Sequence, residues 1–363
     1  MAEVTKELIE EAIQGYTEPH LDKDLVSAKF IKSIEIDGGA VKVAVELGFP
    51  AKGFKDELAD ALKAQITTVE GVSSVAVDVD WKITAHSVQK SLKPIDNVKN
   101  IIAVASGKGG VGKSTTAVNL ALALVEEGAT VGLLDADIYG PSQPRMLGVS
   151  GQPESKDGKS LEPIENYGIQ AMSIGFLIDE ETPMIWRGPM VTQALEQLLN
   201  DTNWANLDYL IIDLPPGTGD TQLTLAQKVP VSGAVVVTTP QDIALLDARK
   251  GFKMFEKVEV PVLGIVENMS THICSNCGHE EHIFGEGGGQ RMAEQYGVNF
   301  LGALPLDIRI REETDGGKPT VVADPDARIS QIYREIARRT TAILALQAKS
   351  YAAKFPNIVI QNN

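Results

Sequence analysis

A glycine-rich phosphate-binding pattern constrains this chain more than any other feature of its sequence. Residues 107–114 read Gly-Lys-Gly-Gly-Val-Gly-Lys-Ser, which fits the spacing Gly-x4-Gly-Lys-Ser. An apolar run at 101–105 predicts a buried strand before it, and residues 115–127 predict a helix after it. A strand, a glycine loop and a helix in this order predict an α/β fold in which backbone N–H groups and the helix N-terminus bind phosphate.

The residues of this loop have separate predicted roles in binding ATP. Lys113 is expected to reach the β- and γ-phosphates, and Ser114 is expected to hold Mg²⁺. Lys108 is predicted to face outward at the mouth of the loop, where it can serve a neighbouring subunit; a solvated surface lysine is the alternative. The predicted nucleotide-binding segment comprises Gly107, Lys108, Gly109, Gly110, Val111, Gly112, Lys113, Ser114 and Thr115.

Two buried strands that end in carboxylates are predicted to complete the phosphate site. Asp135 ends one apolar run, Asp137 follows two residues later, and Asp213 ends another run. The carboxyl ends of parallel strands face the ligand crevice. We expect one of the first two acids to orient the attacking water and the other to support Mg²⁺, while Asp213 contacts Mg²⁺ through water. Gly217 is expected to sense the γ-phosphate through its backbone N–H. An acidic pair that only caps a loop is the alternative.

The remaining apolar runs predict the fold class. Runs separated by helical patterns recur at 131–134, 209–212, 234–238 and 262–266, which predicts a doubly wound, mostly parallel sheet. The first ninety residues instead predict a helix, a hairpin, a helix and a strand, at 5–16, 30–36 with 40–47, 54–67 and 72–79. We therefore expect a small α+β domain at 1–88, a linker at 89–99 and an α/β P-loop NTPase domain at 100–363.

The loop and the acids together resemble the deviant P-loop ATPases, which include the ParA and MinD partitioning proteins, dinitrogenase reductase and the arsenite-pump ATPases. The resemblance implies a nucleotide-bridged dimer in which Lys108 crosses to the phosphates of the partner and Asp137 positions the hydrolytic water. Lys108, Lys113 and Asp137 are therefore the expected catalytic residues. The resemblance also implies that Asn268 contacts adenine and that the chain passes the base near Pro305, although either residue can be an ordinary turn residue.

The only two cysteines, Cys274 and Cys277, form a Cys-x2-Cys-Gly turn six residues after Asn268. Thiolates are soft ligands suited to zinc or to an iron–sulfur cluster. A redox dithiol would need a thioredoxin-like βαβ context. Structural zinc is the main alternative because His279 and His282 lie nearby, but their spacing is tighter than zinc sites usually have. The favoured interpretation is that two chains each donate both cysteines to one [4Fe–4S] cluster.

With the cysteines included, residues 100–326 resemble the Mrp/ApbC family of iron–sulfur cluster carrier ATPases. The resemblance rests on the segments at 133–142, 186–190, 213–220, 239–241 and 274–277. Partitioning ATPases lack the second of these segments, Trp-Arg-Gly-Pro-Met, and the cysteines. The first ninety residues resemble the small assembly-associated domain often fused ahead of these ATPases. Some such domains carry a cysteine after a strand-ending proline, but Ala51 follows Pro50 here, so we assign this domain no metal or persulfide role.

The resemblance implies a homodimeric carrier that shares a [4Fe–4S] cluster between two subunits, with slow Mg²⁺-dependent ATP hydrolysis modulating loading or release. Apo iron–sulfur client proteins and cluster-assembly scaffold proteins are the other expected partners. The net charge of -16 argues against nucleic acid and membrane as partners. A cytoplasmic location is expected because the acidic start does not fit a signal peptide. A ParA/MinD-like positioning ATPase and a zinc-bridged structural dimer with a nucleotide switch stay open as alternatives.

Overall fold

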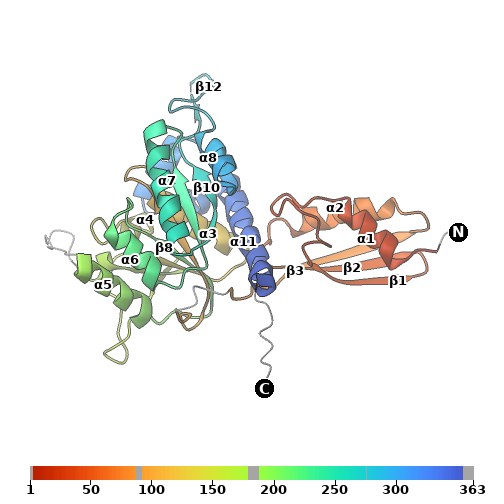
Figure 1. The fold of residues 1–363 in the computed structure, drawn as a ribbon, viewed down its shortest axis with the longest axis horizontal. Coiled ribbons are helices and arrows are strands. Elements are labelled where there is room, and N and C mark those ends of the chain that lie inside the picture. The colour runs from red at the N-terminus through yellow and green to blue at the C-terminus, as the bar shows by residue number, and fades with distance from the viewer. Residues whose placement is uncertain (1–2, 87–91, 179–187, 275, 355–363) are drawn as a thin grey trace, which may run out of the picture. The chain divides into compact units, whose positions relative to one another are not determined.

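The computed structural model describes residues 3–86, 92–178, 188–274 and 276–354, and these residues form two compact units (Figure 1). The smaller unit combines residues 3–86 with residues 341–354, and the larger unit holds the described residues between 92 and 340. Trp186 and Arg187, which carry part of the family resemblance, lie outside the described residues, as do residues 89–91 of the predicted linker.

The smaller unit has the predicted order of helix, hairpin, helix and strand. Its elements are α1 (Lys6–Gln14), β1 (Ile31–Asp37), β2 (Ala40–Leu47), α2 (Lys55–Thr67) and β3 (Ser74–Trp81). The hairpin strands β1 and β2 pair antiparallel. β3 pairs parallel to β2, because α2 forms the crossover that returns the chain to the start of the sheet. The predicted small α+β fold is confirmed.

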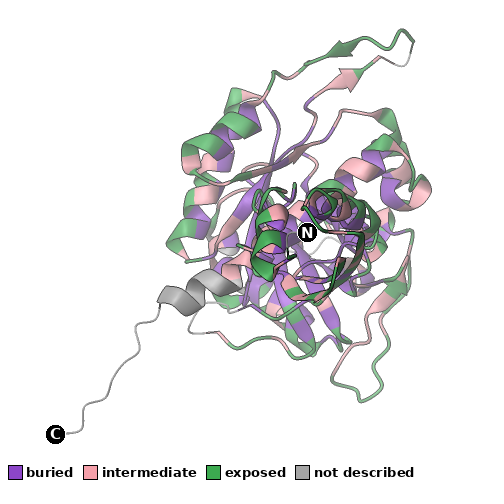
Figure 2. Ribbon diagram, turned by 90° about the vertical axis from the view of Figure 1, so that its right-hand side faces the viewer, coloured by how far each residue is buried: buried purple, intermediate pink, exposed green. Residues whose placement is uncertain are grey.

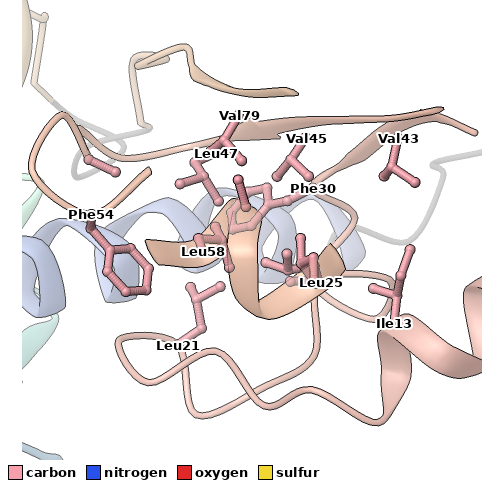
Figure 3. Close-up of a cluster of buried hydrophobic side chains, with 14 of the residues drawn as sticks. Ile13, Leu21, Leu25, Phe30, Val43, Val45, Leu47, Phe54, Leu58 and Val79 are labelled. Atoms are coloured by element: carbon pink, nitrogen blue, oxygen red, sulfur yellow. The ribbon is translucent and has the colours of Figure 1, made fainter. Parts of the chain in front are cut away.

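Alternation along β2 builds the core of the smaller unit. Val41, Val43, Val45 and Leu47 are buried, and the residues between them are more exposed. A side-chain period of two places these four residues on one face of the sheet. Figure 3 shows side chains of this face gathered around Phe30 in the same hydrophobic cluster.

The last helix of the chain also contributes to this core. Ala342 and Ala345 of α11 (Arg328–Lys354) are buried in the same cluster as the strand residues. A Cβ atom added at Gly48 would lie 2.8 Å from the Cβ of Ala345, so glycine permits this close approach. The smaller unit is therefore built from both ends of the described chain.

The larger unit is a doubly wound α/β domain, as predicted. Its sheet has the strand order β13-β10-β9-β4-β8-β5-β7-β6, in which β6 and β7 pair antiparallel and the other neighbours pair parallel. The strands are β4 (Val98–Ser106), β5 (Val131–Asp135), β6 (Ile164–Asn166), β7 (Ile169–Ser173), β8 (Leu207–Asp213), β9 (Gly233–Thr238), β10 (Val262–Glu267) and β13 (Asn299–Ala303). Central strands such as β9 are buried along their whole length (Figure 2).

The direction in which successive strands are added to the sheet reverses at β4. The chain first builds outward through β5 and then crosses to the other side through β9. In open α/β sheets, ligands bind at the carboxyl ends of the strands near such a reversal. α3 packs on β4, β5 and β8, whereas α7 packs on β9 and β10. The helices are α3 (Lys113–Glu126), α4 (Gln143–Met146), α5 (Gly188–Asp201), α6 (Asp220–Lys228), α7 (Asp242–Lys257), α8 (Gly288–Tyr296), α9 (Ile308–Asp315), α10 (Thr320–Ala323) and α11.

A small arm leaves the larger unit after β10. It is a two-stranded antiparallel ribbon of β11 (His272–Ile273) and β12 (Glu280–Glu281), with His272 opposite Glu281 and Ile273 opposite Glu280. The ribbon projects away from the body of this unit (Figures 1 and 2).

In the part of the chain that the structure describes, every helix is too short or too polar to cross a bilayer.

Candidate functional site

The phosphate loop joins β4 to α3 through a backbone that requires glycine. Gly110 and Gly112 have φ angles of 80° and 81°, in the left-handed region that glycine adopts without strain. A Cβ atom at Gly107 would lie 2.1 Å from the backbone of α7. Val111 is buried, and Thr115 lies half-buried in the first turn of α3. Three glycines of the motif, at 107, 110 and 112, therefore have a local physical reason, and phosphate binding by the loop stays a prediction.

Lys113 and Asp213 form a buried ion pair at the start of α3. The Nζ atom of Lys113 donates to Oδ1 of Asp213 and, at 3.2 Å, to Oγ of Ser114. Lys113 is 6% exposed and Asp213 is 0% exposed. Removal of either charged group would strongly destabilise the fold, because the other would be left as a buried charge without a partner. The loop lysine, the hydroxyl group and the strand-ending acid are thus in direct contact.

Asp135 and Asp213 lie side by side because β5 and β8 are neighbours and pair these two residues in register. Asp135 accepts the backbone N–H groups of Asp137 and Ser142 at 3.1 and 3.0 Å. Burial raises the pKa of Asp135 to about 7, and the carboxylate of Asp213 adds to the rise. Asp137 lies in the loop after β5, half-buried, and burial raises its pKa as well. Asp135 therefore anchors the loop that carries Asp137.

Gln143 is a site residue that the sequence reasoning missed. It is the first residue of α4 and is 1% exposed. Its side-chain Nε2 donates to Oδ2 of Asp213 at 2.9 Å and to the carbonyl of Ser114 at 3.1 Å. The only signal at this place is the helix-start pattern of Ser142 and Pro144 around it, which marks a short helix but no chemistry.

Lys108 and Gly217 are both tied to Ser106, the last residue of β4. The Ser106 hydroxyl donates to the Lys108 carbonyl at 2.9 Å, and the Ser106 carbonyl accepts the Gly217 N–H at 3.0 Å. Gly217 has a φ of 100°, which again favours glycine. Its N–H, predicted to sense the γ-phosphate, is held by β4, so sensing requires this bond to break. The roles of both residues stay predictions.

Asn268 joins the phosphate loop to the end of β10. Its N–H donates to the carbonyl of Thr238 at 2.8 Å, and its side-chain Nδ2 donates to the carbonyl of Val111 at 2.9 Å. Pro305 is half-buried, and the residues on both sides of it hydrogen-bond to the connection that follows β10. The two segments predicted to pass the base therefore run beside each other. The adenine contacts themselves stay predictions.

The two cysteines lie on a tight turn at the tip of the arm. The Cys274 carbonyl accepts the N–H of Gly278 at 2.8 Å, and the Cys274 N–H donates to the carbonyl of His279 at 2.9 Å. Gly278 has a φ of 71°, so glycine suits the turn. Cys277 is exposed and Cys274 is half-buried. Hydrogen bonds from the backbone at Cys277 and Asn276, and from the Cys277 side chain, lower the pKa of Cys274.

Two histidines near this turn, His272 and His282, have ring nitrogens close to backbone carbonyls. The Nδ1 atom of His282 lies 3.0 Å from the carbonyl of Ser270, and that of His272 lies 3.1 Å from the carbonyl of Leu306. Within the described residues, no three or more His, Cys, Asp or Glu side chains come together as a metal site. Among the described residues, one chain therefore supplies this turn with two thiols, and no third ligand of these types converges on them.

Family models match both parts of the chain. A model described as NUBPL iron-transfer P-loop NTPase matches residues 97–341. A second model, described as iron-sulfur cluster assembly protein, matches residues 6–79. The first match contains the phosphate loop, the three acids and both cysteines, and the second falls within the smaller unit.

Proteins of known name match over most of the chain. An iron-sulfur cluster carrier protein of Pseudomonas fragi is 62% identical over 278 residues, which cover 76% of this chain and 97% of that protein. The iron-sulfur cluster carrier protein of Escherichia coli strain K12 is 50% identical over 353 residues, covering 96% of this chain and 94% of that protein. A solved nucleotide-binding protein from Archaeoglobus fulgidus in complex with ADP is 39% identical, has a TM-score of 0.56, and covers 64% of this chain and 90% of that chain.

Proposed function

The chain belongs to the family of iron–sulfur cluster carrier P-loop NTPases, and from this membership we propose that two copies hold one [4Fe–4S] cluster between them and pass it to apo-proteins. The cluster is the cargo of this reaction. One observation carries the proposal: the turn at residues 274–277 presents both thiols of the chain at the tip of an arm, with hydrogen bonds that favour the thiolate of Cys274.

The number of thiols supports a site shared by two chains. A [4Fe–4S] cluster takes four thiolate ligands, and each chain has two cysteines. Ile273 and Ile283, on the same arm, are 50% and 52% exposed. Large apolar side chains beside a ligand-bearing turn favour burial against another protein surface. A second copy of the arm supplies the missing thiolates and apolar cover for these isoleucines at once.

The donor set at the phosphate loop fits ATP and Mg²⁺. The Ser114 hydroxyl is a hard oxygen donor of the kind that Mg²⁺ prefers, and it would hold the metal together with the phosphates, while the Asp213 carboxylate would contact the metal through water. Bound Mg²⁺ would neutralise phosphate charge. Lys113 moves from Asp213 to the β- and γ-phosphates, Lys108 reaches the phosphates bound by the second copy, and Asp137 orients the attacking water in a slow hydrolysis.

Asn268 provides a route by which nucleotide influences the cluster. Its side chain is bonded to the phosphate loop at Val111, and Cys274 follows only six residues later in the chain. A change in the loop on binding or hydrolysis of ATP is therefore passed to the base of the arm. Loading or release of the cluster then depends on the state of the nucleotide.

Free thiols and an exposed cargo site favour a reducing compartment, and we place the carrier in the cytoplasm. Cluster-assembly scaffold proteins load it, and apo iron–sulfur proteins receive the cluster. A positioning ATPase with the same loop would bind DNA or membrane, which the net charge of -16 opposes. Co-sedimentation with DNA or liposomes in the presence of ATP separates that function from carriage.

Anaerobic reconstitution with iron and sulfide tests the proposal. We expect a broad absorbance near ~400 nm and about four irons per dimer, as four thiolates per cluster require. Cys274→Ala abolishes both signals, and Thr271→Ala, a substitution in the same connection, leaves them intact. Stoichiometric zinc without iron uptake would establish a zinc-bridged dimer instead. Undiminished cluster binding by Cys274→Ala would exclude the cysteine turn as the cargo site.

A further inference from the structure

Gln143 contacts three parts of the nucleotide site from one buried position. Its backbone N–H donates to Oδ2 of Asp135 at 3.1 Å. Its side-chain Nε2 donates to Oδ2 of Asp213 at 2.9 Å and to the carbonyl of Ser114 at 3.1 Å. The residue is 1% exposed, so water does not compete for these bonds. One residue thus links the ends of β5 and β8 with the first turn of α3.

The hydrogen-bonding partners fix the orientation of the Gln143 amide. The carboxylate of Asp213 and the carbonyl of Ser114 are both acceptors. The amide nitrogen has two hydrogens and can serve both, whereas a flipped amide would turn its oxygen towards two acceptors. The nitrogen therefore faces Asp213 and Ser114. The oxygen, Oε1, is buried and accepts no hydrogen bond from the described residues.

The two oxygens of Asp213 are held by different residues. Oδ1 accepts from Lys113, and Oδ2 accepts from Gln143. Under the proposed function, Lys113 leaves Asp213 for the phosphates of ATP. At that moment Asp213 would be a buried carboxylate next to Asp135, and its only remaining side-chain donor among the described contacts is Gln143. A buried carboxylate without any donor is not held in one orientation, because no hydrogen bond fixes its oxygens.

We infer that Gln143 is a positioning residue, which keeps Asp213 oriented for Mg²⁺ while Lys113 binds the phosphates. The inference rests on the proposed ATP binding and does not depend on the cysteines. It separates two tasks at the site. The glycine loop and Lys113 bind the phosphates with or without the metal. Gln143 acts on the metal-dependent part, through its bonds to Asp213 and to the carbonyl of Ser114.

The test compares Gln143→Leu and Gln143→Glu with the wild-type chain. Leucine has a similar size but no donor, and glutamate turns acceptors towards Asp213. Affinity for a fluorescent ATP analogue is measured in EDTA and again across a Mg²⁺ titration. We expect affinity in EDTA within about two-fold of wild type. The gain in affinity from Mg²⁺ falls about ten-fold for Gln143→Leu, as loss of a hydrogen bond to a charged group implies, and further for Gln143→Glu.

The control is Gln170→Leu. Gln170 lies on β7 of the same unit, and its side-chain amide is hydrogen-bonded to the backbone of Ala205, away from the phosphate loop. It leaves the Mg²⁺ response unchanged. In steady-state hydrolysis, the two Gln143 variants lower kcat with little change in KM for ATP at saturating Mg²⁺. A role in packing alone predicts that leucine is tolerated, because it fills the same volume with apolar atoms.

An unchanged Mg²⁺ response in both Gln143 variants overturns the inference, as does an equal loss of affinity in EDTA and in Mg²⁺. Should Gln143→Leu unfold, Gln143→Glu and the Mg²⁺ titration still decide the question. A wild-type chain that neither binds nor hydrolyses ATP overturns the proposed nucleotide function, and this inference with it. Loss of the cluster in Cys274→Ala bears only on the cargo site.

Discussion

Replacement of Asn268 by alanine removes the hydrogen bond that joins the phosphate loop to the connection leading to the cysteines. The Asn268 amide donates to the Val111 carbonyl at 2.9 Å, and the two residues are 8% and 3% exposed. Alanine offers no donor, so the Val111 carbonyl is left buried without this partner. We expect the variant to lose stability, triphosphate affinity and the influence of ATP on cluster transfer.

The size of the effect follows from the burial of the carbonyl. A buried acceptor left unsatisfied costs about 1–3 kcal/mol of folding free energy. In a domain the size of the larger unit, each kcal/mol lowers Tm by roughly 2–4 °C. If the whole cost appears in nucleotide binding, the affinity for ATP falls by about 5- to 150-fold.

Calorimetric titration with ATP and with GTP separates loop support from recognition of the base. Loss of loop support weakens both nucleotides alike, whereas loss of an adenine contact weakens ATP alone. The control is Asn299→Ala, which removes a comparable asparagine bond, to the carbonyl of Leu263 at 3.0 Å, away from the loop. Cluster transfer to an apo-acceptor is then compared with and without ATP in all three proteins.

Two results would refute this reasoning. If Asn268→Ala lowers Tm but binds both nucleotides as the wild type does, the contact with Val111 is structural only. If the variant loses affinity for ATP but keeps its affinity for GTP, Asn268 acts on the base and the loop needs no support from it. A transfer rate that responds to ATP as in the wild type would exclude this bond as the route of coupling.

Three further predictions, which use four substitutions, test burial and backbone geometry. Burial raises the pKa of Asp135 to about 7, so between about pH 4 and pH 7 the folded state binds more protons than the unfolded state and stability falls as pH rises. Asp135→Asn flattens this dependence in urea unfolding, and an unchanged slope would contradict it. Backbone N–H groups lower the pKa of Cys274. In the variant Cys277→Ser, where Cys274 is the one thiol left, the thiolate absorbance is therefore expected to appear at lower pH in the folded protein than in the urea-unfolded protein. Coincident titration curves would contradict this. Gly107→Ala, whose Cβ meets α7 at 2.1 Å, melts below wild type, whereas Gly109→Ala, with its nearest neighbour at 4.0 Å, melts with it; equal melting temperatures would contradict the steric reasoning.

The fold class and the phosphate loop could be predicted because their signals are local. The apolar run of β4, the glycine loop and the helix α3 follow one another within 29 residues, from Val98 to Glu126. The glycines at 110 and 112 occupy left-handed backbone, which the residue type itself makes accessible. The fold of the smaller unit could be predicted for the same reason, since its hairpin turn and the alternation of buried residues along β2 are short-range patterns.

The contacts that complete the site join residues far apart in the sequence, and spacing alone does not predict them. Gln143 and Asp213 are 70 positions apart, and Asn268 and Val111 are 157 apart. Whether such residues come into contact depends on which strands are neighbours in the sheet and in which register they pair. The alternation of buried and exposed residues along one strand says nothing about either. The same holds for Ala342, because helical periodicity gives no sign that this part of α11 packs in a core formed near the other terminus.

The single bond at Asn268 is large enough to carry the proposed coupling. A nucleotide can shift the affinity for the cluster only by the free-energy difference between the two states that link the sites. Here the two states are the hydrogen bond between Asn268 and Val111, made or broken. Couplings between sites are typically about 1–3 kcal/mol, which is also about the cost of leaving the Val111 carbonyl unsatisfied. The base of the arm is fixed to the sheet, because the Asn268 N–H extends the pairing of β10 with β9. Between Asn268 and the cysteines the chain is bonded to the segment around Pro305, because the Ser270 N–H donates to the Leu304 carbonyl and the Thr271 carbonyl accepts the Leu306 N–H. A displacement of Asn268 therefore has to move these contacts as well before it reaches the cysteines.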